Sequence, residues 1–160
     1  MEFDINSVEE TLKLGNCIGK LLNPGDIVCL TGDLGAGKTH LTKGIAAGLE
    51  IDDYITSPTF TIINEHVGRL KLYHFDVYRV NDPDEIYAIG FDEYIFSEGV
   101  SVIEWANYIE ELIPEDYISI EIRKNLEKGN DGRKISINCF GKRYDTINSK
   151  LTTNFSQSIE

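Results

Sequence analysis

The sequence predicts a three-layer α/β fold built on a mixed parallel and antiparallel central sheet. Helix-like and strand-like patterns alternate along the 160 residues. A glycine-rich turn joins a short apolar strand, residues 27–31, to the helix that follows it. Two later pairs of strand-like segments are separated by short polar turns, which is typical of antiparallel hairpins.

The first third of the chain predicts a helix, a strand and a second helix. Ser7 and Glu10 form a capping box, and helically spaced apolar residues after them predict a helix to about Leu22. A Pro-Gly-Asp turn then leads into IVCLT, residues 27–31, whose β-branched residues on both faces indicate a central strand. The next helix is expected from about residue 38 to residue 49.

The middle of the chain predicts a hairpin and a short helix. Segments 58–67 and 69–78 are rich in β-branched and aromatic residues and are joined across Gly68. In segment 81–90, Asp82 can cap a helix, Pro83 suits its first position, and Gly90 ends it.

The last third predicts a buried strand at 99–105, a short helix at 106–114 stopped by Pro114, and a hairpin. That hairpin pairs segments 117–123 and 134–140 across the GNDG turn. With no internal repeat, one domain is expected over residues 1–150, and residues 151–160 are expected to form a loose tail with little to pack.

Composition restricts the partners of the chain. The formal net charge of -12 makes the surface repel a phosphate backbone, so extended nucleic-acid binding by this chain alone is not expected. No apolar run approaches the roughly 20 residues that span a bilayer, and the first ten residues are acidic, so a cytoplasmic location away from membranes is expected. Three separated cysteines are interpreted as small buried hydrophobes, and three histidines show no metal-ligand spacing.

The segment GDLGAGKT contains a complete phosphate-binding motif. Gly32, Gly37, Lys38 and Thr39 match G-x-x-x-x-G-K-[ST], the P-loop. Glycines allow backbone angles at which several N–H groups converge on one anion, and the following helix adds its positive dipole end. Lys38 supplies a charge to the outer phosphates, and the Thr39 hydroxyl can bind Mg²⁺. The predicted fold is therefore P-loop NTPase-like.

Hydrolysis of a nucleotide also needs an acid near the metal and a group that orients water. Glu104 ends an apolar strand, where such an acid stands if that strand lies beside the P-loop strand. Asp76 ends the preceding hairpin and is a second candidate. An acid at a strand end is more often a cap or turn residue than a ligand, and this alternative stays open for both, although the P-loop favours a functional acid nearby.

A hydroxyl-rich segment and a single tryptophan complete the candidates. In TSPTFT, the hydroxyls of Ser57, Thr59 and Thr61 can reach a terminal phosphate as a switch segment does, although a polar loop entering a strand is the simpler interpretation. Trp105, which follows Glu104, is interpreted as a core or an interface residue.

Four segments together resemble one family. GDLGAGKT, SPTFT, LYHFDVYR and IEW, in this order and spacing, resemble the TsaE family, also called YjeE, of bacterial P-loop ATPases. The resemblance runs from the opening helix to the strands after Pro114. It implies an ATPase that uses Mg²⁺ and assists the proteins TsaB and TsaD in forming threonylcarbamoyladenosine at position 37 of tRNAs that read ANN codons.

The resemblance also implies roles for individual residues. Asp76 and Glu104 are the implied catalytic acids, Thr39 and Glu104 the implied metal ligands, and Trp105 a partner or switch residue. Which acid holds the metal and which orients water stays open. The implied nucleotide contacts are Asp33, Leu34, Gly35, Ala36, Gly37, Lys38, Thr39, His40 and Thr59. His40 departs from the small hydroxyl residue common after the P-loop threonine.

The predicted function is an accessory ATPase whose nucleotide state sets its affinity for partner proteins. The negative charge predicts that tRNA is held through those partners rather than by this chain. Two alternatives are a small-molecule kinase and a nucleotide-binding module without catalysis. A kinase usually needs an Arg-rich lid, and the scattered arginines of this chain do not indicate one. Adenine specificity, the docking-competent nucleotide state and the oligomeric state have no signal in the sequence.

Overall fold

The computed structural model describes residues 1–160 and is organised around one seven-stranded sheet with the strand order β1-β7-β6-β2-β5-β4-β3. The strands are β1 (Glu2–Ile5), β2 (Ile27–Thr31), β3 (Ile63–Val67), β4 (Lys71–Asp76), β5 (Val100–Glu104), β6 (Tyr117–Lys124) and β7 (Arg133–Phe140).

The centre of the sheet is parallel and its margins are antiparallel. β2 pairs in parallel with β5 on one side and β6 on the other, and β5 pairs in parallel with β4. β3 is antiparallel to β4, β7 to β6 and β1 to β7. The hairpins predicted for β3–β4 and β6–β7 are therefore confirmed, as is the mixed α/β sheet.

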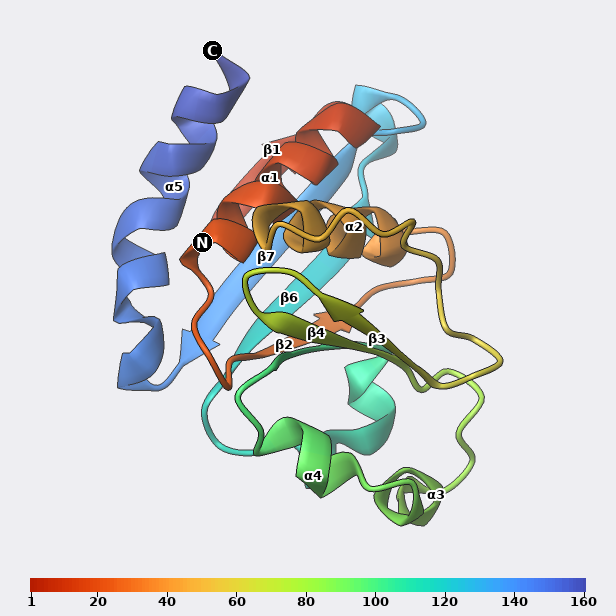
Figure 1. Cartoon of the computed structure of the whole chain (residues 1–160). Coiled ribbons are helices and arrows are strands. Elements are labelled where there is room, and N and C mark those ends of the chain that lie inside the picture. Colours follow the sequence, from red (N-terminus) through yellow and green to blue (C-terminus); the bar gives the residue numbers. More distant parts are fainter.

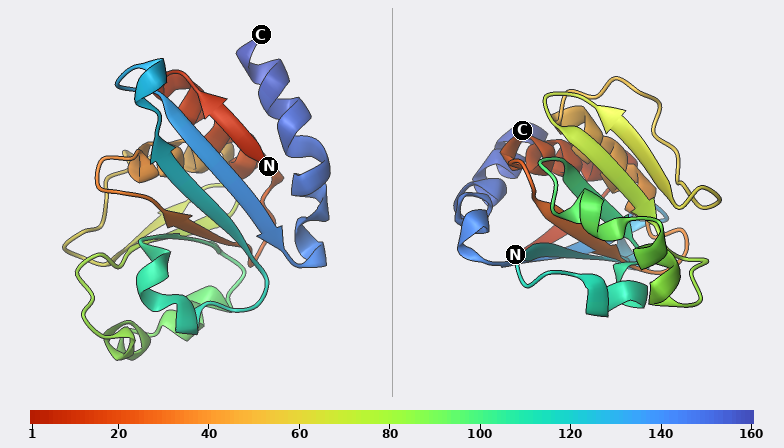
Figure 2. Two further views of the ribbon diagram at one scale, coloured as in Figure 1. Left: turned by 180° about the vertical axis from the view of Figure 1, so that it is seen from behind. Right: turned by 60° about the horizontal axis from the view of Figure 1, so that its bottom comes forward.

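Helices cover both faces of the sheet (Figure 1; Figure 2). One face carries α1 (Val8–Leu21), α2 (Lys38–Gly48) and α5 (Asp145–Ile159), which share one core with the sheet. The other face carries α3 (Pro83–Ala88), α4 (Phe91–Ile95) and the 3₁₀ segment η1 (Ala106–Leu112) around a smaller core. Two further 3₁₀ turns are η2 (Leu126–Lys128) and η3 (Lys142–Tyr144). No helix combines the length and the apolar character that crossing a membrane requires.

The helices α1 and α2 pack backbone against backbone through two pairs of glycines. Gly15 and Gly19 of α1 face Gly44 and Gly48 of α2. A Cβ added at Gly15 would lie 2.5 Å from the Leu41 carbonyl oxygen and 2.8 Å from Gly44 Cα. Because α2 begins at the P-loop, this close approach sets where the loop lies relative to the sheet.

The C-terminal segment differs from the loose tail expected after residue 150. Residues 145–159 form α5, whose Ile147, Leu151 and Phe155 are buried in the larger core. Phe155 packs edge-to-face on Phe3 of β1, with ring centroids 5.4 Å apart. The four-residue spacing of these apolar side chains makes one helical face, and burial of that face against α1 and the β1–β7 side of the sheet stabilises a sequence that is otherwise polar.

Three smaller differences concern short elements. β1 was not predicted, because four residues acquire strand geometry only by pairing with β7. α4 follows α3 directly after Gly90 and was also not predicted. The strand expected from residue 58 begins only at Ile63, since Ile62 has a left-handed backbone with φ of 70° that ends the extended conformation.

Candidate functional site

The P-loop connects the end of β2 to the start of α2. Gly35 and Gly37 have φ of 77° and 110°, a region in which residues with a Cβ are strained. In this conformation the Lys38 side chain folds back over the loop, and Nζ donates hydrogen bonds to the carbonyl oxygens of Gly32 at 2.7 Å and Asp33 at 3.0 Å. The loop therefore adopts its curved shape with the lysine already directed inward.

Two opposing effects act on the pKa of Lys38. Burial lowers the pKa of its ammonium group, and the nearby carboxylates of Glu104, Asp76 and Asp33 act in the opposite direction. The ammonium group also lies 3.9 Å from the ring centroid of Trp105, a cation–π distance. The Lys38 ammonium group can attract an anionic ligand, while the nearby carboxylates repel it. The site therefore suits an anion that arrives with a bound metal cation, which offsets this repulsion.

Glu104 lies next to the P-loop because β5 is the direct neighbour of β2, with Glu104 paired to Leu30. The carboxylate is almost fully buried. Its Oε1 accepts a hydrogen bond from Thr39 Oγ1 at 3.1 Å, and its Oε2 lies 2.5 Å from His74 Nε2. The adjacency on which the prediction for Glu104 depended is therefore confirmed.

Asp76 lies on the next strand, β4, directly opposite Glu104 in the register. Its Oδ2 accepts hydrogen bonds from the hydroxyls of Ser57 at 2.6 Å and Thr59 at 3.2 Å. Its Oδ1 accepts the Tyr78 backbone N–H at 3.0 Å. The hydroxyl-rich segment therefore docks on an acid of the site, a contact that the sequence did not predict.

Trp105 has the left-handed φ of 63° and turns the chain away from β5 into η1. Its ring lies 4.6 Å from that of Tyr78 and 5.7 Å from that of Tyr108, measured between centroids. Trp105 is partly buried, packs against the smaller core and also lines the site, where its ring lies between the lysine and two half-exposed tyrosines.

Arg133 is a site residue that the sequence analysis missed. From the start of β7, its Nε donates to the Ala36 carbonyl at 2.6 Å and its Nη2 to the Gly35 carbonyl at 3.3 Å. Its Nη1 donates to the carbonyls of Asn130 and Gly132, both at 2.8 Å. The guanidinium group thus connects the β6–β7 loop to the outer side of the P-loop, and no local pattern marks this role.

These groups surround a cavity of about 510 Å³. Of the predicted site residues, Asp33 and Ala36 do not line it: Asp33 is exposed outside it and the Ala36 side chain is in the core. The predicted residues that do line it are Leu34, Gly35, Gly37, Lys38, Thr39, His40, Thr59, Asp76, Glu104 and Trp105. Most of the predicted site is therefore brought together in one place.

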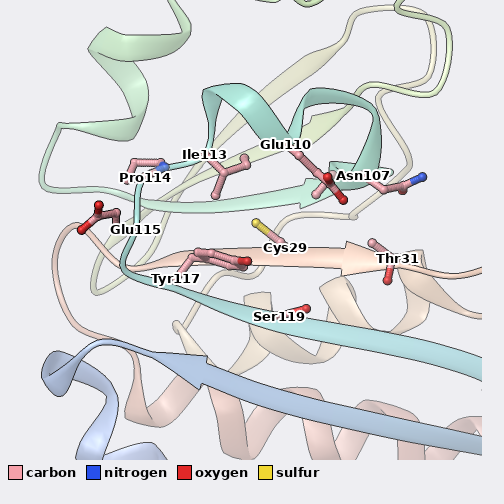
Figure 3. Close-up of a pocket in the computed structure, with 10 residues that line it drawn as sticks. Cys29, Thr31, Asn107, Glu110, Ile113, Pro114, Glu115, Tyr117 and Ser119 are labelled. Atoms are coloured by element: carbon pink, nitrogen blue, oxygen red, sulfur yellow. The ribbon is translucent and has the colours of Figure 1, made fainter.

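A second cavity, of about 370 Å³, lies beneath η1, on the face of β2 that is turned away from α2. Figure 3 shows Cys29 and Thr31 on β2 and Tyr117 on β6 lining it. It contains no basic side chain, while Glu110 and Glu115 line it. This charge disfavours a phosphate, so the P-loop cavity is the better candidate for an anionic ligand.

The donor set of the P-loop cavity fits Mg²⁺. The hydroxyl of Thr39 and the carboxylates of Glu104 and Asp76 are hard oxygen ligands, which this ion prefers, and they lie beside a phosphate-binding loop. Mg²⁺ typically uses one or two carboxylates together with phosphate oxygens, rather than a complete protein cage.

Comparison with known proteins places this geometry in a family. The model of the Threonylcarbamoyl adenosine biosynthesis protein TsaE family matches residues 5–135. The chain belongs to the TsaE family. The match contains every site residue described above and ends before α5.

Individual TsaE proteins cover most of the chain. The protein of Bacillus subtilis (strain 168) is 44% identical over 145 residues, spanning 90% of this chain and 89% of its own length. That of Treponema pallidum (strain Nichols) is 43% identical over 131 residues, spanning 82% and 95%. The crystal structure of Bacillus subtilis YdiB superimposes with a TM-score of 0.82 at 38% identity, covering 96% of this chain and 94% of that one.

Proposed function

We propose that this chain binds and hydrolyses ATP with Mg²⁺ and serves as an accessory ATPase in the formation of threonylcarbamoyladenosine in tRNA. One observation carries the catalytic part of the proposal. Lys38 and Thr39 of the P-loop share one cavity with Asp76 and Glu104, which end neighbouring strands.

The P-loop residues would bind the phosphates of ATP. The backbone N–H groups of the loop and the N-terminus of α2 attract an anion, and the Lys38 ammonium would exchange its carbonyl partners for phosphate oxygens. Thr39 and Glu104 would hold Mg²⁺, whose chemistry is to neutralise charge on the phosphate oxygens. The hydrogen bond between Thr39 and Glu104 supports this assignment, because it already brings both ligands together.

Asp76 would orient the attacking water. It is the carboxylate farther along the sheet from the P-loop strand, and Ser57 and Thr59 fix one of its oxygens. Through these contacts the segment that carries Ser57 and Thr59 can respond to the terminal phosphate as a switch does. A change of that segment on hydrolysis would alter the surface available to partners.

The pathway is proposed from the family. The related proteins are named for tRNA threonylcarbamoyladenosine biosynthesis, and we extend this role to the present chain. The modified base would be adenosine 37 of tRNAs that read ANN codons, and the partners TsaB and TsaD. With a net charge of -12, this chain would contact tRNA chiefly through those partners.

Steady-state ATP hydrolysis by the purified chain tests the catalytic part. We expect slow turnover that requires Mg²⁺ and falls about 100-fold or more in Glu104→Gln and in Asp76→Asn, while ATP still binds. Glu110→Gln, which removes an exposed carboxylate at the second cavity, is the matched control and should hydrolyse ATP at the wild-type rate. Wild-type rates in both site variants would refute the catalytic assignment.

Addition of TsaB and TsaD tests the accessory role. We expect the hydrolysis rate to rise when both proteins are present, because coupling to partners changes the free energy of the nucleotide-bound states. If neither the rate nor the nucleotide affinity changed on adding them, the proposed partnership would be wrong even if the chain hydrolysed ATP.

A further inference from the structure

His74 lies directly beneath the site and is fully buried on β4, two residues before Asp76. Its Nε2 lies 2.5 Å from Glu104 Oε2, and its Nδ1 is buried without a hydrogen-bond partner in the protein. The ring therefore makes a single hydrogen bond, and that bond is to an acid of the proposed metal site.

We propose that His74 is a positioning residue that holds the Glu104 carboxylate in the orientation needed for Mg²⁺. The inference rests on the proposed role of Glu104 and adds a function for a residue outside the cavity. His74 is not among the residues that line the cavity, so it acts through Glu104 and touches neither nucleotide nor metal.

The geometry divides the two carboxylate oxygens between different tasks. Oε2 is directed toward β4 by His74, and Oε1 is thereby directed toward Thr39, at 3.1 Å from its hydroxyl. No Lys or Arg forms an ion pair with Glu104, so the histidine is the one basic side chain that fixes this carboxylate directly. Without it, the side chain could rotate and take Oε1 away from the loop.

Packing alone does not account for a histidine at this position. A buried polar ring with one unpaired nitrogen is less favourable than an apolar side chain of similar size, unless its hydrogen bond is needed. Two neighbours of His74 on the same face of the sheet, Leu72 of β4 and Val102 of β5, are apolar members of the larger core. The polar Asn64 of β3 pairs with His74, but its side chain makes no hydrogen bond with the His74 ring. The bond to Glu104 is what a leucine at this position would lack.

The arrangement defines the ring tautomer. A carboxylate oxygen accepts hydrogen bonds, so Nε2 carries the proton that is donated to Oε2. In metal sites, partners that orient a ligand typically change metal affinity 10- to 100-fold when they are removed. We therefore expect loss of His74 to weaken the Mg²⁺-dependent part of nucleotide binding, and to spare the part that the loop and Lys38 provide.

Calorimetric titration of ADP, in Mg²⁺ and again in EDTA, tests this separation. His74→Leu should lose about tenfold or more of the affinity measured in Mg²⁺ and keep that measured in EDTA. His74→Gln, whose amide N–H can reach the position of Nε2, should restore most of the loss. His66→Gln is the matched control. His66 lies on the edge strand β3 and is hydrogen-bonded to Asp53, away from the site, so its replacement should leave both ADP affinities unchanged.

The same titrations can overturn the inference. Equal losses in Mg²⁺ and EDTA would indicate a purely structural role, and an unchanged Mg²⁺ effect in His74→Leu would remove any role. Absence of a Mg²⁺ effect in the wild type would also refute it. Because binding of ADP is measured, a chain that binds nucleotide without hydrolysing it still tests His74 independently of the proposed ATPase.

A spectroscopic measurement covers the case in which His74→Leu does not fold. In the ¹⁵N-histidine NMR spectrum of the wild-type protein, His74 should show a protonated Nε2 whose proton resonance is shifted downfield by the bond to Glu104. Glu104→Gln should remove that shift. A spectrum with the proton on Nδ1 and none on Nε2 would overturn the inference, since Nε2 could then not donate to Glu104.

Discussion

Replacing Gly44 by alanine tests whether α2 is held in place by backbone contact with α1. A Cβ at this position would meet the Leu12 carbonyl oxygen and would lie 2.9 Å from Gly15 Cα. Carbon atoms pack at about 3.5–4.0 Å, so the helices must separate by roughly 0.6–1.1 Å. Both obstructing groups are backbone, so no side-chain rotation relieves the contact.

The free-energy change follows from two opposing effects. Overpacking a tight interface costs about 1–3 kcal/mol, and backbone obstruction places this site near the upper limit. Alanine gains about 1 kcal/mol over glycine in helix propensity. We therefore expect Gly44→Ala to lower the free energy of unfolding by about 2 kcal/mol, which in a chain of this length lowers Tm by roughly 4–8 °C.

Urea and thermal unfolding followed by circular dichroism measure both quantities. Ala47→Gly, at an exposed position in the last turn of the same helix, isolates helix propensity and should lower the free energy of unfolding by up to about 1 kcal/mol. If propensity alone mattered, Gly44→Ala would gain a similar amount. A Gly44→Ala protein as stable as the wild type, or more stable, would therefore refute the packing argument.

Three further predictions concern the P-loop, the last helix and the thiols. Arg133→Gln should weaken ADP binding about tenfold both in Mg²⁺ and in EDTA, because a charged donor to the loop carbonyls is lost. Arg123→Gln, which replaces an exposed arginine near the end of β6, should bind ADP normally in the same titration. Leu151→Ala should lower the free energy of unfolding by about 3 kcal/mol in urea, and a loss below about 0.5 kcal/mol would contradict the packing of α5. Burial raises the pKa of Cys29 to about 12, so at pH 8 its thiol stays protonated, and iodoacetamide followed by mass spectrometry should modify half-buried Cys139 first. Faster modification of Cys29 in the native protein would contradict its burial.

The local elements of the fold were predictable because their signals are contiguous in the chain. The capping box at Ser7 and the turn before residue 27 correctly predicted α1 and β2. Segment 134–140 was expected to pair with 117–123, and β6 and β7 do pair. Elements that depend on a distant partner, such as β1 and α5, were missed or expected to be loose, because their stability comes from tertiary burial.

The sequence by itself determined the P-loop, because its glycines, lysine and threonine act through local backbone geometry between one strand and one helix. Only the tertiary structure decided which groups surround it. The strand order put Glu104 beside the loop and Asp76 beside Glu104, and the start of β7 brought Arg133 to the loop carbonyls. His74 obtained its partner from a strand 30 residues away. Hydrogen bonds between distant segments depend on sheet register, which no pattern within a single segment encodes.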